Sequence, residues 1–226
     1  MSVTAFPATV PTQPDVRVIV MSEAGPAGAV PVDGVGVWLL DPSPGRAAAV
    51  ASALTPDEAA RASRARRGSG EKFTAVRGTL RQLLGHELGV APREVPIVYG
   101  DHGKPAIDPA LGSDLGFNVS HTGGLAAIAV AHGREVGVDV ELRRPRRRLD
   151  LLARATLTAG ERARFDLVPR SEQLGAFLDA WSAKEAYSKL LGRGVGIGFD
   201  ALELDEVRSR VARLPLPPSH SGALAA

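Results

Sequence analysis

The sequence predicts an α+β fold built from two similar halves in tandem. Stretches with strand-like alternation are interspersed with stretches of helical spacing, and one series of landmarks occurs twice, roughly 100 residues apart. Chance similarity in a chain rich in Ala, Leu and Arg is the alternative, but a common order at a nearly common offset favours duplication. The paired landmarks are a Val-Gly-Val strand (Val35, Val136), a helix-capping sequence (Leu54, Leu157), a phenylalanine (Phe73, Phe177) and Leu-Leu-Gly (Leu83, Leu190).

The composition is that of a globular protein with a core, and it excludes several function classes. Of 226 residues, 44% are hydrophobic and 23% charged, and no apolar run approaches the roughly 20 residues of a membrane span. The N-terminal segment lacks the basic start and apolar centre of a signal peptide, so we expect a soluble cytoplasmic protein. The absence of cysteine excludes disulfides, thiolate metal sites and cysteine nucleophiles. A net charge of +2 with a pI near 9.3 indicates a local basic surface.

The predicted organisation is a leader followed by two halves. Residues 1–33 contain five prolines and one strand candidate at Val16–Val20, which is typical of a flexible leader. We expect an N-terminal α+β half at 34–124 and a C-terminal α+β half at 125–226 that carries a metal site.

In the first half, the firmest strand prediction is Val35–Leu40. Thr55 and Glu58 have the spacing of a capping box with proline at the first helical position, so a helix should begin there and run to about Arg64. Helical spacing also predicts a short helix at 47–54 and, after a Gly-Ser-Gly break, a longer one at 73–88.

In the second half, residues 125–131 and 136–141 have the pattern of a β-hairpin. Thr158 and Glu161 repeat the capping box, and Leu174–Leu191 reads as one helix. We expect a glycine-rich loop with one or two strands after Gly192, and an irregular, proline-broken tail from Ala212 onward.

Two carboxylates share one face of the strand at 136–141. Because side chains alternate along a strand, the valines point to one face while Asp139 and Glu141 point to the other, roughly 6 to 7 Å apart. Unpaired, these charges repel, and a hard divalent cation such as magnesium would relieve the repulsion. The alternative is a solvated strand face, on which alternating polar residues are common.

The helix at 174–191 places a third carboxylate where an apolar residue is expected. At about 100° per residue, Glu185 falls in the stripe of Phe177 and Trp181. A buried lone carboxylate costs several kcal/mol, roughly, unless it is paired or bound to a metal. Asp139 and Glu141 could complete a three-carboxylate site with it. The alternative is an i,i+4 pair of Glu185 with Lys189 on an exposed helix.

Basic side chains in several segments suit a polyphosphate substrate. The two-half arrangement is expected to bring them toward one cleft, although most lone arginines are solvated surface. A nucleophile–base pair at Ser120 and His121 is disfavoured, because neighbours on a strand point to opposite faces. The residues expected at the cleft are Arg61, Arg64, Arg77, Lys104, His121, Lys184 and Lys189.

Five arginines lie between Arg143 and Arg148, directly after the acidic strand. A solvated loop, contact with nucleic acid and docking of an acidic protein all remain open. No aromatic residues interleave with them, which disfavours a single-strand stacking platform.

The motifs GKP, FNVSHTGG, GVDVE and WSAKEAYSK, in that order between about Leu54 and Asp200, resemble those of the surfactin-type 4′-phosphopantetheinyl transferases, in a W/KEA-like form. This resemblance implies a monomeric pseudo-dimer of two α+β halves. It implies transfer of the phosphopantetheine arm of coenzyme A to a serine of an acyl or peptidyl carrier protein, leaving adenosine 3′,5′-bisphosphate. Magnesium, or manganese, is the implied cofactor. The carriers would belong to polyketide or non-ribosomal peptide synthases of secondary metabolism, without nucleic-acid or membrane partners.

The resemblance also implies roles for individual residues. Asp139, Glu141 and Glu185 correspond to metal ligands, with Glu185 also the base for the carrier serine and Asp139 and Lys189 in the catalytic set. Lys184 and Lys189 correspond to residues that hold the coenzyme's phosphates. Those that correspond to contacts with its nucleotide end are Arg61, Arg77, Lys104, Ser120 and His121, the last near the 3′-phosphate.

The chain departs from this family pattern at Gly78, in the RARRGSG spacing and in a shorter tail after Val207. Two other function classes stay open on the residues alone. One is a basic nucleic-acid-binding module acting through Arg143 to Arg148, and the other is a different magnesium-dependent phosphate enzyme.

Overall fold

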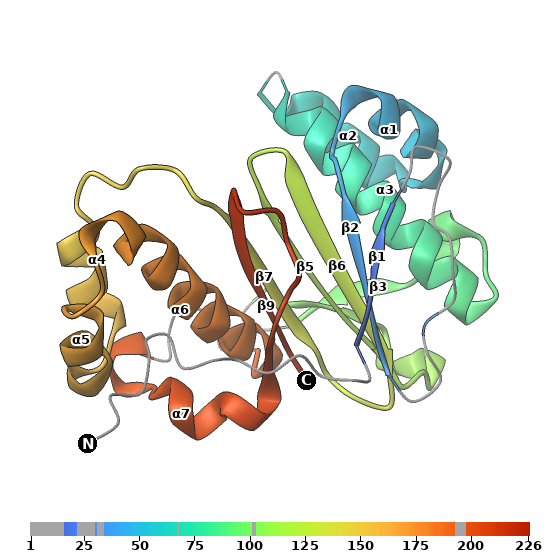
Figure 1. Ribbon diagram of the computed structural model, residues 1–226. Coiled ribbons are helices and arrows are strands. Elements are labelled where there is room, and N and C mark those ends of the chain that lie inside the picture. The colour runs from blue at the N-terminus through green and yellow to red at the C-terminus, as the bar shows by residue number, and fades with distance from the viewer. Residues whose placement is uncertain (1–15, 22–29, 31–33, 67, 101–102, 193–197) are drawn as a thin grey trace.

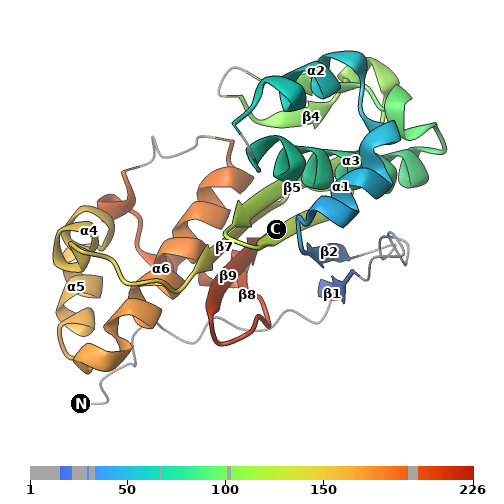
Figure 2. The same ribbon diagram turned by 90° about the horizontal axis from the view of Figure 1, so that it is seen from above.

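Two β-sheets occupy the middle of the molecule, and helices cover the outer side of each, as Figures 1 and 2 show for the computed structural model. The structure describes residues 16–21, 30, 34–66, 68–100, 103–192 and 198–226. Most of the predicted leader therefore lies outside the described residues. Within the described ranges, no helix combines the length and apolarity needed to cross a membrane.

The first sheet has four strands in the order β1-β2-β6-β5. β1 pairs in parallel with β2, and the other pairs are antiparallel. The predicted strands at 16–20 and 35–40 are confirmed as β1 and β2. The strands are β1 (Val16–Val20), β2 (Val35–Leu40), β5 (Leu115–Thr122) and β6 (Leu125–His132), and a separate ribbon pairs β3 (Ile97–Tyr99) with β4 (Pro105–Ile107).

Three helices follow β2 and cover the outer face of this sheet. The predicted helix at 47–54 is α1 (Pro44–Val50) with a 3₁₀ turn at Ala51–Ala53, and the helix predicted from the first capping box is α2 (Pro56–Arg64). α3 (Ser69–Leu88) begins earlier than predicted, directly after Gly68, whose φ of 82° breaks the chain direction.

The second sheet has the order β7-β9-β8 and is antiparallel throughout. Helices α4, α5 and α6 lie between β7 and β8 in the chain. The second capping box and the helix predicted at 174–191 are both confirmed. The elements are β7 (Gly137–Leu142), α4 (Leu149–Thr156), α5 (Ala159–Phe165), α6 (Arg170–Leu190), α7 (Leu204–Val207), β8 (Val211–Arg213) and β9 (His220–Ala225).

The predicted hairpin between 125–131 and 136–141 is wrong. β6 forms its hairpin with β5, in a register that pairs Thr122 with Leu125 across the two glycines. Gly123 has a φ of 53°, and a tight two-residue hairpin turn requires such a positive φ. The glycine pair Gly123–Gly124 therefore forms the turn of the β5–β6 hairpin.

This pairing also corrects the division of the chain after residue 124. β6, which was expected to open the second half, lies between β2 and β5 in the first sheet. The second sheet begins only at Gly137, so the change from one sheet to the other falls between His132 and Gly137.

The expectation of an irregular tail is also wrong, because β9 is the central strand of the second sheet. Its small residues lack strand propensity. Gly222 instead leaves room for Leu216 and the Asp139 carbonyl, and Ala223 packs in the apolar cluster of α6. The predicted strands after Gly192 are not found in 198–207, which form a 3₁₀ turn and α7; residues 193–197 lie outside the described part.

The strand orders of the two sheets correspond. In each, a first strand is followed by helices and then by a hairpin whose second strand pairs with it, giving β2-β6-β5 and β7-β9-β8. β1 and the β3–β4 ribbon are additions to the first half. This correspondence supports the proposed relation between two similar halves.

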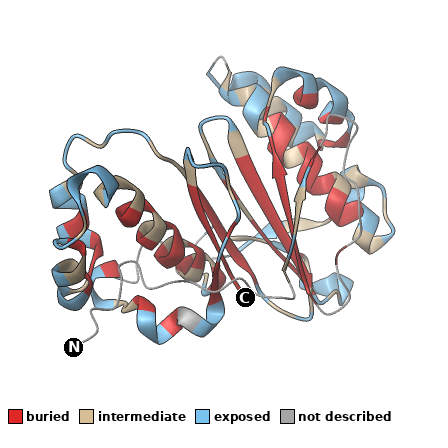
Figure 3. Cartoon of the chain, viewed as in Figure 1, coloured by how far each residue is buried: buried red, intermediate tan, exposed pale blue. Residues whose placement is uncertain are grey.

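Buried residues concentrate along the strands of both sheets and on the helices that cover them (Figure 3). Their apolar side chains form three clusters. Trp38 and Ile128 face α3, whereas Val37, Ala129 and Val138 belong to a cluster shared by the inner faces of the two sheets. A third cluster packs α6 against the outer face of the second sheet. The two sheets are thus joined by an apolar layer between them.

An ion pair at the capping box connects the helices of each half. In the first half, Glu58 Oε2 accepts from the Thr55 amide at 3.0 Å and from Arg81 Nε of α3 at 2.6 Å. Arg81 Nη1 in turn donates to the carbonyls of Pro92 and Val95. The capping glutamate thus links α2, α3 and the chain that follows α3.

The second half repeats this arrangement with a lysine. Glu161 Oε2 accepts from the Thr158 amide at 3.0 Å and from Lys184 Nζ of α6 at 2.5 Å. Lys184 Nζ also donates to the carbonyls of Thr156 and Phe199, at 2.9 and 2.7 Å. Both charged side chains are fully buried. The three ammonium protons therefore have three partners inside the protein.

Replacing Lys184 should destabilise the fold strongly. Lys184→Met leaves Glu161 as an uncompensated buried charge, and we expect the free energy of unfolding to fall by about 3 to 5 kcal/mol, measured by urea denaturation. Lys72→Met, at an exposed position of α3, is the matched control and should change stability by less than about 0.5 kcal/mol. A Lys184→Met variant as stable as the control would contradict this role of the pair.

Candidate active site

The outer face of β7 lies against α6 at very short range. An ideal Cβ built on Gly137 would lie 2.0 Å from the Ala186 carbonyl oxygen, so only glycine fits there. The next two residues on the same face of β7 are Asp139 and Glu141, and Glu185 precedes Ala186 on α6. The close approach of helix and strand therefore brings the three predicted carboxylates to one place.

Asp139 is buried and held by donors from two other elements. Its Oδ1 accepts from Ser120 Oγ of β5 at 2.9 Å and from Lys189 Nζ of α6 at 2.7 Å. Lys189 Nζ also donates to the Val138 carbonyl at 3.1 Å. Asp139 Oδ2 is buried and has no hydrogen-bond partner among the described residues.

Glu141 lies at the edge of the same face and is partly neutralised. Arg146 Nη2 donates to its Oε2 at 2.9 Å, and Trp181 of α6 also hydrogen-bonds to it. Burial and the negative charge of Asp139 raise the pKa of Glu141, while Arg146 and Trp181 act in the opposite sense. Sequence reasoning missed Arg146 as a partner, although it lies five residues beyond the strand's last carboxylate.

Glu185 is half-buried on α6, as its place in the apolar stripe indicated. Burial is the main cause that raises the pKa of Glu185, and the charges of Asp139 and Glu141 raise it further, against the lowering effect of Lys189. Lys189 forms its ion pair with Asp139, so the i,i+4 interpretation does not describe its contact.

The carboxylates fit a divalent cation in donor type, but they are not arranged as a ready ligand set. Within the described residues, no three His, Cys, Asp or Glu side chains lie close enough together to hold a metal ion. Asp139 Oδ2 is nevertheless an orphaned, buried oxygen. Burial and then the negative charge of Asp139 raise the pKa of both Glu141 and Glu185. Hard oxygen donors of this kind are the ligands that magnesium prefers.

A cavity of about 500 Å³ lies in the first half, between α3, the β3–β4 ribbon and β5. Three predicted residues line it: Arg61, Arg77 and His121. The guanidinium of Arg61 lies 4.9 Å from the Phe73 ring centre, and that of Arg77 lies 5.8 Å from both the Phe73 and Tyr99 rings. The walls thus combine cations with aromatic faces, as suits a nucleotide carrying phosphate.

Some lining residues of this cavity escaped the sequence analysis. Tyr99 accepts a hydrogen bond from Arg77 Nη2 at 2.8 Å and is half exposed. Lys72 of α3 also lines the cavity. Phe73, which the sequence analysis treated only as a repeat landmark at the start of a predicted helix, also lines the cavity. The signal for Phe73 was that it precedes Arg77 by four residues, which places both side chains on one face of α3. Tyr99 stands in a strand too short to show a pattern.

β5 connects the cavity with the carboxylates through two neighbouring residues. His121 lines the cavity, while Ser120 points the other way and contacts Asp139. Ser120 is not among the lining residues, so the structure places it at the carboxylate rather than at the predicted nucleotide end. Lys104 is also outside the lining; its Nζ pairs with Glu135 and donates to the Leu190 carbonyl at the end of α6.

Lys184 corrects the sequence-based expectation. We expected it to hold phosphates at the cleft, but it is fully buried with its ammonium bound to Glu161 and two carbonyls. Position 184 lies seven residues after Phe177, and therefore on the buried side of α6. A lysine there needs an internal partner, which the capping box supplies.

The arginine run divides into structural and exposed members. Arg143 pairs with Asp179 of α6 at 2.8 Å and donates to Ser221 Oγ, and Arg146 pairs with Glu141. Arg144, Arg147 and Arg148 are exposed.

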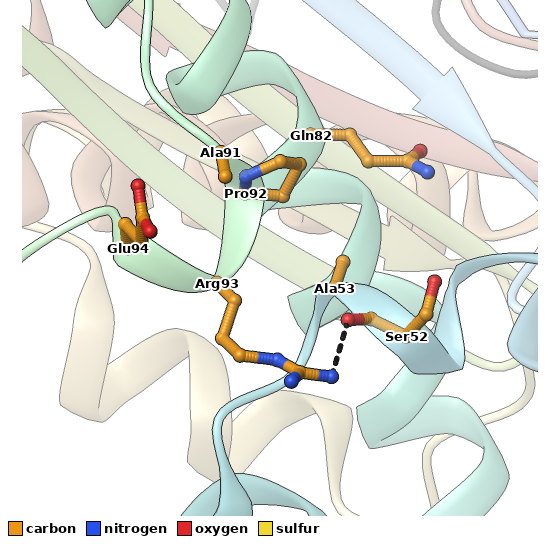
Figure 4. Close-up of a pocket in the computed structure, with 7 residues that line it drawn as sticks. All are labelled: Ser52, Ala53, Gln82, Ala91, Pro92, Arg93 and Glu94. Atoms are coloured by element: carbon orange, nitrogen blue, oxygen red, sulfur yellow. Dashed lines mark hydrogen bonds between the residues drawn. The ribbon is translucent and has the colours of Figure 1, made fainter.

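A second cavity, of about 360 Å³, lies at the other end of the first half (Figure 4). Arg93 reaches across it and donates to the Ser52 carbonyl at 3.1 Å. None of the predicted site residues line this cavity, which is bounded by Ser52, Ala53, Gln82, Ala91, Pro92, Arg93 and Glu94.

Comparisons with known proteins agree with this geometry. Residues 135–221 match the model of the 4′-phosphopantetheinyl transferase superfamily, a range that includes β7 and α6. The chain is 36% identical to 4′-phosphopantetheinyl transferase HetI of Nostoc sp. over 178 residues, which cover 76% of this chain and 73% of that protein. It is 41% identical to 4′-phosphopantetheinyl transferase AcpT of Escherichia coli over 112 residues, 50% of this chain and 55% of that protein.

A putative 4′-phosphopantetheinyl transferase of Synechocystis sp. is 29% identical over 163 residues, 72% of this chain and 66% of that protein. The identity to HetI over most of both chains shows common family membership, and the superfamily match agrees with it across the carboxylate site. The chain belongs to the 4′-phosphopantetheinyl transferase family.

Proposed function

We propose that this protein transfers the 4′-phosphopantetheine arm of coenzyme A to a serine of an apo acyl or peptidyl carrier protein. The observation that carries the proposal is the position of β5. Its neighbouring residues Ser120 and His121 contact Asp139 on one side and line the cationic, aromatic cavity on the other. An acidic site suited to a metal thus adjoins a cavity suited to a phosphorylated nucleotide, and adenosine 3′,5′-bisphosphate is the expected second product.

Asp139, Glu141 and Glu185 are the residues that would hold magnesium, or manganese in its place. Bound there, the metal would supply charge neutralisation for the pyrophosphate of the coenzyme. For Glu141 to take part, Arg146 must release it, since the two are now paired at 2.9 Å. Lys189 already bonds Asp139 and is positioned to add positive charge on the same side.

Glu185 is our candidate for the general base. A proton acceptor works best when its pKa approaches the working pH, and burial moves the pKa of Glu185 upward from its ordinary value. Its carboxylate would accept the proton of the carrier serine as that oxygen attacks the phosphorus, while Arg61, Arg77 and His121 hold the nucleotide end of the coenzyme.

The exposed arginines suit a carrier protein with an acidic surface. Arg144, Arg147 and Arg148 lie beside α4, where Leu151 is 55% exposed. Such a mixture of positive charge and apolar side chain favours docking of an acidic, partly apolar helix. We further propose that the protein acts in the cytoplasm as a monomer on carriers of polyketide or non-ribosomal peptide synthases.

The first prediction concerns the reaction itself. Incubated with coenzyme A, Mg²⁺ and an apo carrier protein, the chain should raise the carrier's mass by one phosphopantetheine arm, as measured by intact-protein mass spectrometry. A control carrier with its acceptor serine replaced by alanine should keep its mass. If several apo carriers stay unmodified while the chain binds DNA or RNA in a salt-sensitive way, the nucleic-acid alternative through Arg143 to Arg148 would be favoured instead.

The second prediction tests the base. Glu185→Gln keeps the size of the side chain but removes its basicity, and we expect kcat to fall by roughly 10² to 10⁴, measured by the carrier assay under saturating substrates. Glu172→Gln, at an exposed position near the start of the same helix, is the control and should keep wild-type kcat. A Glu185→Gln variant with full activity would refute the assigned role.

The third prediction tests the cavity. His121→Ala should raise the KM for coenzyme A about tenfold, because a hydrogen bond to a charged group contributes roughly 1.5 to 3 kcal/mol. Steady-state kinetics with 3′-dephospho-coenzyme A should show a smaller change, because the 3′-phosphate is the expected partner. His86→Ala, exposed on α3, should leave both KM values unchanged. An equal effect of His121→Ala on both substrates would place the histidine elsewhere on the coenzyme.

A further inference from the structure

The two sheets meet along β5 and β7 through side chains rather than a backbone ladder. Amides of β7 donate to side-chain oxygens on alternate residues of β5: Val138 to Asn118 at 3.0 Å, Val140 to Ser120 at 3.3 Å and Leu142 to Thr122 at 3.3 Å. We call these three hydrogen bonds the seam. Among the hydrogen bonds of the described residues, only the middle member of the seam, Ser120, also bonds a carboxylate of the candidate site.

Ser120 makes a second hydrogen bond, to Asp139. A hydroxyl has one proton, and since Ser120 Oγ accepts from the Val140 amide, that proton is available for Asp139 Oδ1 at 2.9 Å. Ser120 is only 8% exposed. The Ser120 hydroxyl is therefore held between two groups of β7, the Val140 amide and the Asp139 carboxylate.

The two carboxylate oxygens of Asp139 therefore differ in their surroundings. Oδ1 takes both donors, Ser120 and Lys189, and Oδ2 is left buried without a partner among the described residues. A carboxylate that could rotate freely would present either oxygen. Two donors from different elements fix one of them and leave the other available.

We propose that Ser120 is a positioning residue for Asp139, which keeps Oδ2 available to the metal, and that Ser120 does not bind the coenzyme. This inference rests on the proposed function, because it takes Asp139 as a metal ligand. It differs from the role at the nucleotide end that the family resemblance implies for Ser120. The neighbouring His121 lines the cavity, and Ser120 does not.

The experiment measures binding of Mn²⁺ to the free full-length chain by isothermal titration calorimetry. Ser120→Ala should weaken Mn²⁺ binding about tenfold, the lower end of the usual effect of residues that orient metal ligands. Ser120→Thr, which keeps the hydroxyl, should restore binding to within about twofold of wild type. The affinity of Ser120→Ala for coenzyme A in EDTA should equal that of the wild type.

Thr122→Val is the matched control. It removes a seam hydrogen bond of the same 3.3 Å length but no contact with Asp139. We expect it to lower the Tm about as much as Ser120→Ala while leaving Mn²⁺ affinity unchanged. An equal loss of Mn²⁺ affinity in Thr122→Val would overturn the proposal, because the effect would then belong to the seam as a whole.

Two further outcomes separate this inference from the proposed function. If wild type binds Mn²⁺ and Ser120→Ala binds it equally well, or loses coenzyme A affinity in EDTA instead, the role of Ser120 is refuted while the metal site stands. If the wild-type chain does not bind Mn²⁺, the metal role of Asp139 fails and the inference fails with it.

Discussion

In each half, the glutamate that caps one helix also binds the buried cation of the next, and the rest of that half is arranged around this pair. Glu58 holds Arg81 and Glu161 holds Lys184. Each cation then donates to backbone carbonyls of the segment after its helix, so one ion pair aligns two helices and a loop. Since the pair in the second half is fully buried, α6 has little freedom to shift relative to α5 and to the segment at Phe199. Glu185 directly follows Lys184, and its position beside the carboxylates of β7 depends on this anchor together with the close contact at Gly137.

The two halves share their order of elements and differ at the first strand. Both have a strand, a capping box and a long helix with a buried cation, in the same sheet order. At the strand, however, the first half has Trp38 in its core where the second has a carboxylate. The first half instead forms the cationic, aromatic cavity with α3 and the β3–β4 ribbon. A shared scaffold thus carries two different binding chemistries, which β5 brings together.

Much of the fold could be predicted because it depends on local signals. Alternation placed Asp139 and Glu141 opposite the valines of β7, and the capping boxes at Thr55 and Thr158 fixed two helix starts. β9 could not be predicted, because its small residues carry no strand pattern and its place is set by packing against α6. The hairpin was misassigned because β6 has an apolar strand both before it and after it in the sequence. Only the two glycines before β6 indicate that its hairpin partner is β5 and not β7.

The candidate site was predicted in its acidic part and less well elsewhere. Because a carboxylate is costly to bury, a carboxylate at an apolar position of the sequence pattern indicates a functional site. The same reasoning assigned Lys184 to the site, but Lys184 lies on the buried side of α6 and serves the fold. The positions of Ser120 and Tyr99 in the site depend on contacts with residues of other elements, which the spacing along a single strand cannot predict.

Gly137 shows how a residue without a functional group can set the dimensions of a reaction centre. Where any other residue would carry a side chain, Gly137 has only a hydrogen between β7 and the Ala186 carbonyl of α6. The gap between the helix and strand that carry the acidic groups is therefore as small as polypeptide backbones allow. Any side chain at this position would widen that gap before it altered a single charge. An inventory of acids and bases would overlook the residue that governs how near they can come to each other.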